Sequence, residues 1–187
     1  MQSPTPDRSS GSPAILDAAT YYAIESLGTG RQVEIRALTP DDKAGLIAAF
    51  DRTSKQSRYR RFFAVRRGFT EKEIAFFVNV DFVKHVALVA VAEENGRPTI
   101  VGGGRYVVVQ PGKAEVAFAV VDQYQGQGIA GALLRHLVAI ARGSGLAELI
   151  AEVLPDNEPM LKVFEKSGLH LTTKRDPDVV HLTLRVS

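Results

Sequence analysis

The sequence predicts one α/β domain built on a mixed sheet, mostly antiparallel, with one parallel strand pair and helices on its faces. Two observations lead to this fold class. Valine-rich runs at 86–92 and 99–109 flank Asn95-Gly96, a strong hairpin signal, and a glycine-containing turn then leads into a third strand of an antiparallel meander. Beyond it, apolar residues recur every three to four positions over 129–140, and an apolar run follows at 149–154. A strand, helix, strand unit of this kind implies parallel pairing.

The N-terminal region is expected to stand apart from this domain. Residues 1–13 are rich in serine, proline and glycine and offer almost nothing to bury. Residues 14–27 are expected to form a short helix or an irregular cover, which two nearby glycines end. We therefore expect a flexible extension over residues 1–30 and an ordered domain over residues 31–187.

Two helices are predicted between the first strand, which holds Val33 and Ile35, and the hairpin. Thr39-Pro40-Asp41-Asp42 combines a cap, a proline at the first helical position and two acids in the first turn, so one helix should run to about residue 52. Thr70 to Glu73 forms a capping box at the start of the other, which should end near residue 79.

Between these helices, residues 57–63 interleave arginine with tyrosine and phenylalanine. This basic segment has two interpretations. It binds an anion or lines a substrate entrance, or it is a solvated arginine face with phenylalanine packed beneath it. The sequence leaves both open.

Glycines and a helix cap later in the sequence complete the predicted fold. Gly102 to Gly104 should weaken or bulge the second strand of the hairpin and let another stretch of backbone or a ligand come close. Asn157 is a plausible cap for a last helix, and Gly168 suits its C-terminal end. Residues 169–173 and 179–186 are expected to close the chain as a hairpin.

Composition excludes several classes of function. The 187 residues are 45% hydrophobic, which suits one domain with a substantial core. A net charge of +2 gives no argument for nucleic acid, and the absence of cysteine excludes disulfides and thiolate chemistry. The four histidines lack ligand spacing, so we expect no metal. No apolar run reaches the length of a membrane span and no signal peptide is evident, so a cytoplasmic protein with no membrane partner is expected. The oligomeric state stays open.

A candidate anion site follows the third strand of the meander. The strand that carries Glu115 ends in a four-residue link, and Gly126-Gln127-Gly128 then opens an amphipathic helix. Glycines let backbone N–H groups converge on an anion at a helix N-terminus. Gly126, Gly128 and Gly131 also spell the dinucleotide pattern G-x-G-x-x-G, with Glu152 further on. The four-residue gap and the short remaining chain disfavour that alternative.

Another pattern fits the spacing better. Gln125-x-x-Gly128-x-Ala130 resembles the Q/R-x-x-G-x-G/A signature of the GNAT superfamily of acyl-CoA-dependent N-acyltransferases, and residues 157–169 resemble its second signature. The predicted element order over residues 31–186 looks like the GNAT fold. The resemblance implies acetyl-CoA as cofactor, with these binding residues: Val120, Val121, Gln125, Gly126, Gln127, Gly128, Ile129, Ala130, Gly131, Asn157 and Phe164.

Within the superfamily, residues 57–63 together with Glu115-Val116-Ala117 are similar to the acetyltransferase domain of bacterial protein-lysine acetyltransferases of the Pat type. This implies acetyl transfer to a primary amine, with a protein lysine, such as one on an acyl-CoA synthetase, as the favoured acceptor. A small-amine N-acetyltransferase is one alternative. A non-catalytic coenzyme A-binding regulatory module is another, and Phe164 supports it: many GNAT enzymes have there a tyrosine that can protonate the departing thiolate.

Glu115 is the predicted general base. A lysine amine with a pKa near 10.4 is protonated at neutral pH and must lose a proton before it can attack a thioester. Strand alternation puts Glu115 on one face with Ala117 and Ala119, which leaves space for substrate or water. Partial burial would raise the pKa of this carboxyl toward the range of a base. Without cysteine or a Ser/His/Asp set, direct attack by the amine is the expected mechanism.

Overall fold

The computed structural model describes residues 17–187, so the expectation for residues 1–13 lies outside the described part of the chain. Eight strands form one sheet in the order β1-β2-β3-β4-β5-β6-β8-β7. Only β5 and β6 pair in parallel within this sheet, which confirms the predicted fold class. The strands are β1 (Tyr22–Ser26), β2 (Gln32–Ala37), β3 (His85–Glu94), β4 (Arg97–Gln110), β5 (Lys113–Val120), β6 (Glu148–Val153), β7 (His170–Arg175) and β8 (Val180–Arg185).

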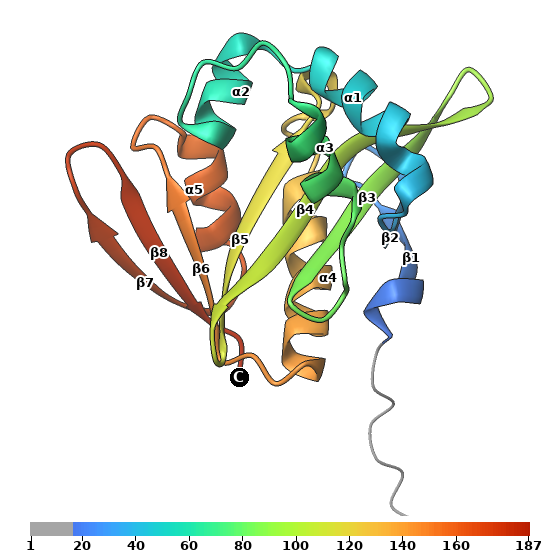
Figure 1. Cartoon of the computed structure of the whole chain (residues 1–187). Coiled ribbons are helices and arrows are strands. Elements are labelled where there is room, and N and C mark those ends of the chain that lie inside the picture. The colour runs from blue at the N-terminus through green and yellow to red at the C-terminus, as the bar shows by residue number, and fades with distance from the viewer. Residues whose placement is uncertain (1–16) are drawn as a thin grey trace, which may run out of the picture.

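Helices cover both faces of this sheet (Figure 1). The α1–α3 face carries α1 (Lys43–Asp51), α2 (Lys55–Phe62) and α3 (Glu71–Val78) over β3, β4 and β5. The α4–α5 face carries α4 (Ile129–Gly143) and α5 (Glu158–Glu165), and the larger hydrophobic core lies beneath α4. Short 3₁₀ turns precede β1, α1 and α4, at Ala18–Thr20, Pro40–Asp42 and Asp122–Tyr124. Within residues 17–187, no helix is long and apolar enough to cross a bilayer.

The N-terminal expectation is wrong for residues 17–30. Apart from the 3₁₀ turn Ala18–Thr20, they form neither a flexible extension nor a short helix or irregular cover, because Tyr22–Ser26 is a strand paired along its length with β2. Side chains hold it further: His136 of α4 bonds the Glu25 carboxylate at 2.7 Å and also contacts the Tyr21 hydroxyl. These partners are more than a hundred residues away in sequence, which explains why the local pattern misses them.

Three helices, not two, separate β2 from β3. The predicted capping box of α3 is confirmed, with Thr70 and Glu73 bonding each other's backbone N–H groups. The additional helix is the basic segment itself, α2, whose N-cap Ser54 accepts from the Ser57 N–H. Phe62 at its end packs against Phe69 at a ring distance of 5.5 Å, so the interpretation of phenylalanine packed beneath the arginines holds.

The predicted irregularity at Gly102 to Gly104 is confirmed, and side chains are what approach it. The β3–β4 register shifts opposite this run. A Cβ on Gly104 would lie 2.7 Å from the Phe118 ring and 3.2 Å from Leu137 of α4. Gly104 therefore lets α4 and β5 close against β4 on the α4–α5 face.

We predict that Gly104→Ala destabilises the protein by about 1–3 kcal/mol, because the added methyl overpacks this contact. Gly103→Ala is the matched control. Its Cβ would meet only the Leu88 carbonyl oxygen, at 3.4 Å, on the other face. Urea unfolding of both variants measures the difference, and equal stability of the two would contradict the packing argument.

Candidate active site

A cleft opens where β5 and β6 separate. The two strands pair over three residues each, Lys113 to Glu115 with Glu148 to Ile150, and then diverge toward their carboxyl ends (Figure 1). The cleft has a volume of about 880 Å³, and its lining comes from α1, α2, α3, β4, β5, the turn after β5, α4, β6 and α5. This size lies within the range of ligand sites of proteins.

The turn between β5 and α4 forms a cradle of backbone donors. Gly126 and Gly128 have φ values of 74° and 95°, in the left-handed region that favours glycine. Within residues 17–187, the N–H groups from Gly126 through Gly131 donate to no protein acceptor, and Cβ positions on both left-handed glycines would face open space. Because these donors gather at the N-terminus of a 15-residue helix, the cradle suits a phosphate or pyrophosphate group.

Side chains brace this cradle against α2. The amide nitrogen of Gln125 donates to the Val120 carbonyl at 3.0 Å and to the Ser57 hydroxyl at 3.1 Å. The Asp122 carboxylate accepts from the Ser54 N–H at 3.1 Å. The side-chain amide of Gln125 therefore stabilises the conformation of the turn, and Gln125 also lines the cleft.

Most of the predicted binding residues lie together. The cleft lining includes Val120, Val121, Gln125, Gly126, Gly128, Ile129, Ala130, Gly131, Asn157 and Phe164. Gln127 is an exception, because its side chain turns back to the Gln123 carbonyl, outside the lining.

Val121, one of the predicted binding residues, offers the ligand no backbone donor. The Val121 N–H already bonds the Val101 carbonyl of β4 at 2.9 Å, so it cannot pair with a ligand amide. Backbone groups of successive residues in a strand point to opposite sides. The Val120 N–H therefore points to the edge of β5 that β6 has left, where it is available to a ligand.

Asn157 and Phe164 act mainly within α5. The Asn157 side chain caps the helix by accepting from the Met160 N–H, as expected. Phe164 is 1% exposed and packs 6.0 Å from the Phe118 ring on the α4–α5 face. Phe164 closes the floor of the cleft and has no proton to donate.

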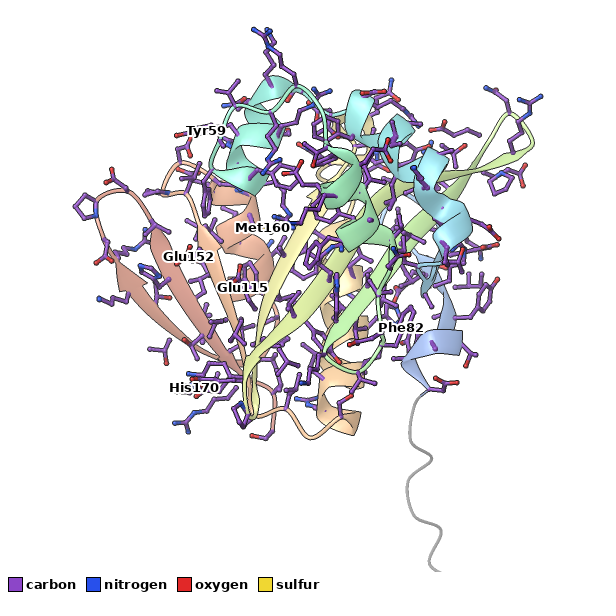
Figure 2. All side chains as sticks on the ribbon, in the orientation of Figure 1. Tyr59, Phe82, Glu115, Glu152, Met160 and His170 are labelled. Carbon is purple, nitrogen blue, oxygen red and sulfur yellow. The ribbon has the colours of Figure 1, made fainter. Side chains whose placement is uncertain are left out.

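Glu115 lies on the α1–α3 face, at the last paired residue before β5 and β6 separate (Figure 2). Its antiparallel partner is Val107, and the neighbouring pair on the same face is Ala117 with Arg105. The side chain is exposed, so the expected partial burial is wrong. The cleft lining begins one residue later, at Val116, which puts the carboxylate at its edge.

Two arginines next to Glu115, Arg61 and Arg105, have lowered pKa values. Loss of water around the guanidinium lowers the pKa of Arg61 to about 10, against partial compensation by Glu115. Desolvation and repulsion by Arg61 lower the pKa of Arg105 to about 9. Sequence reasoning flagged the segment with Arg61 but missed Arg105, because only strand register brings β4 beside Glu115.

Neither a metal site nor a dinucleotide fold is found in the described residues. No group of three or more metal-binding side chains occurs in residues 17–187. The alternative reading of the glycines as a dinucleotide motif is wrong, because the sheet has a single parallel pair and not a doubly wound order.

Comparisons with known proteins agree with this geometry. The model of the Acetyltransferase (GNAT) family matches residues 47–169. An acetyltransferase of Pseudomonas aeruginosa is 30% identical over 156 residues, which cover 83% of each chain. The acetyltransferase Pat of Mycolicibacterium smegmatis is 32% identical over 142 residues, 75% of this chain but 42% of that protein. The crystal structure of the GNAT domain of S. lividans PAT superposes with a TM-score of 0.79 at 36% identity, covering 88% of this chain and 96% of that one.

His85, which bonds Arg105 beside the cleft, makes the stability of the protein depend on pH. Desolvation lowers the pKa of His85 to about 4, and Arg105 donates to its Nε2 at 2.9 Å. Since the unfolded pKa is about 6.5, the unfolded chain binds more protons between these values. The contribution of His85 to stability is therefore fully present above pH 6.5 and is lost as the pH falls toward 4, by an amount on the order of 3 kcal/mol. We predict that His85→Gln, which keeps an acceptor for Arg105, loses less stability than the wild type when urea unfolding is compared at pH 7 and pH 5.

Proposed function

Since the chain belongs to the GNAT family of acetyltransferases, we propose that it transfers the acetyl group of acetyl-CoA to the ε-amine of a protein lysine, with Glu115 as the general base. Acetyl-CoA is the acetyl donor of this enzyme family. One observation carries the assignment of the base: Glu115 stands exposed on the α1–α3 face where β5 and β6 separate, beside the cleft that would hold the donor.

The residues around the cleft suit acetyl-CoA along its length. The N–H groups from Gly126 through Gly131 hold the pyrophosphate in the cradle described above. The Val120 N–H on the open edge of β5 bonds an amide of the pantetheine arm, as a strand partner would. Phe164 and Phe118 supply an apolar floor. The thioester end then lies next to Ala117, two residues from Glu115.

In the proposed mechanism, the residues of the cleft position the two substrates and Glu115 carries out one proton transfer. Glu115 takes the proton of the ammonium, directly or through water, so that a neutral amine attacks. The open edge of β5 orients the thioester carbonyl carbon of acetyl-CoA toward this amine. When the carbon–sulfur bond breaks, the new amide nitrogen releases its second proton to solvent, and solvent protonates the departing thiolate, whose thiol has a pKa near the ~8.5 of cysteine. Phe164 therefore does not argue against catalysis.

A protein acceptor is favoured over a small amine by the openness of the α1–α3 face. Beyond Glu115 the face continues over β6, β8 and β7, where no helix of residues 17–187 lies in front of the strands (Figure 1). Glu152, on the same face of β6, is exposed as well (Figure 2). Such a surface admits a lysine presented by another protein. The similarity to Pat proteins supports the same acceptor.

We predict that Gly131→Val weakens acetyl-CoA binding at least tenfold, because its side chain enters the cradle from the first turn of α4. The fold should survive, since valine is a better helix former than glycine and a Cβ here would meet nothing closer than 4.0 Å. Gly143→Val, at the other end of α4 and outside the cleft, is the control. Thermal stabilisation by acetyl-CoA measures both. Normal binding by Gly131→Val would put the anion elsewhere.

We predict that Glu115→Gln lowers kcat by about 10²- to 10⁴-fold, the usual worth of a general base, with little change in acetyl-CoA affinity. The loss should shrink at high pH, where the amine deprotonates without help. Thiol release over a pH series measures it. Glu152→Gln is the comparison, because Glu152 is the other carboxylate on this face at the cleft. A larger loss in Glu152→Gln, or a loss in Glu115→Gln that stays constant with pH, would remove Glu115 from the role of base.

A further inference from the structure

The cleft is strongly cationic. Of the described residues in its lining, nine are lysine or arginine, and Glu152 alone is acidic. The pyrophosphate cradle uses backbone donors, so it does not account for all of these charges. Several of the cations are engaged within the protein: Arg58 donates to the Phe50 carbonyl at 2.9 Å, and Arg60 donates to the Asp156 backbone at 3.1 Å.

Arg61 and Arg105 differ from these cations. Within residues 17–187, Arg61 forms no hydrogen bond or ion pair, and its guanidinium stacks on the Phe62 ring at 4.7 Å. Arg105 uses one nitrogen, Nη1, for the Phe77 carbonyl and His85, and stacks on the Phe77 ring at 4.7 Å. Its Nη2 and Nε stay available. Both guanidinium groups thus lie over aromatic rings and keep N–H groups that bond no other part of residues 17–187.

Arg61 and Arg105 lie close to the proposed position of the acceptor amine. Arg105 lies opposite Ala117, on the face that carries Glu115. At about 3.3 Å per strand residue, Ala117 is about 10 Å from Val120, before the cradle begins. Arg61 enters from α2 above the same strand and is close enough to both Arg105 and Glu115 for their charges to act on one another. The pair therefore borders the place where amine and thioester meet.

Arg61 and Arg105 are half-buried like charges that form no ion pair with a carboxylate of residues 17–187, and such a pair is costly to hold side by side. An ammonium alone would be repelled by them, with only Glu115 to offset the repulsion. An anion would be attracted, and a planar carboxylate matches the donor geometry of guanidinium groups.

From this geometry we propose that Arg61 and Arg105 bind a carboxylate carried by the acceptor next to the amine that is acetylated. In a protein acceptor this group is an aspartate or glutamate side chain that flanks the lysine. The inference rests on the proposed function and gives it a substrate rule: the enzyme selects lysines with an acidic neighbour.

The test compares lysine peptides that differ only in the flanking residues, aspartate or glutamate in one set and asparagine or glutamine in the other. Thiol release from acetyl-CoA gives kcat and KM separately. We expect the acidic peptides to have a kcat/KM about 10- to 100-fold higher, mostly through KM, as for a charge-assisted hydrogen bond. Arg61→Gln should remove most of this preference, and Arg61→Glu should reverse it toward lysine-flanked peptides.

Arg61 is the better position to change, because it has no hydrogen bond to lose and its replacement should leave the fold intact. Arg67→Gln is the matched control, since it removes a neighbouring positive charge that does not line the cleft. It should keep the preference for acidic peptides. Arg105→Lys serves as a second variant, because it keeps the charge but loses the planar donor pair, and it should weaken the preference without reversing it.

Equal kcat/KM for the two peptide sets in the wild type would overturn the proposal. So would a loss in Arg61→Gln that is the same for both sets and appears as a shifted kcat pH profile, because the arginines would then act by lowering the pKa of the amine. The failure of the lysine assignment looks different. If no peptide is acetylated, free amino acids and their amides form the second arm, where a preference for the carboxylate that Arg61→Gln abolishes supports the arginine site with a small acceptor. No preference there would overturn it.

Discussion

The separation of β5 from β6 after three residue pairs is the constraint on which the site depends. In a continuous sheet, the N–H groups along this edge of β5 would be spent on β6. Here β6 turns away to pair fully with β8 instead. The open edge, the cleft and the placement of the glycine turn at its top all follow from that divergence. In the proposed function, backbone groups thus supply both the donors for the phosphate and the edge for the rest of the ligand.

How far the sequence predicts this site depends on the range of the interaction that makes each part. The glycine turn is a local signal, because positive φ at Gly126 and Gly128 and the start of α4 are encoded within a few residues. The caps of α3 and α5 are local as well. Strand register is not, and it alone reveals that Arg105 stands next to Glu115 and that the Val121 N–H is already bonded.

Burial is the second quantity that the pattern of residues does not give. Alternation correctly places Glu115 with Ala117 on one face, but the exposure of that face depends on which helices cover it. They cover β3, β4 and β5 and stop short of β6. Likewise β1 is apparent only through its pairing with β2 and through the bonds of Glu25 to α4, neither of which leaves a trace in the local sequence.

The bracing of the turn by α2 has a consequence for how the two substrates influence each other. Gln125 and Asp122 tie the cradle to Ser57 and Ser54, the first residues of the helix that carries Arg61. The same hydrogen bonds therefore hold the turn proposed to bind acetyl-CoA and the helix α2 that borders the proposed acceptor site. A ligand that rigidifies these hydrogen bonds from the donor side also orders α2 on the acceptor side. Thermodynamic linkage makes this coupling equal in both directions. We therefore expect acetyl-CoA and the acceptor to change each other's affinity by the same factor.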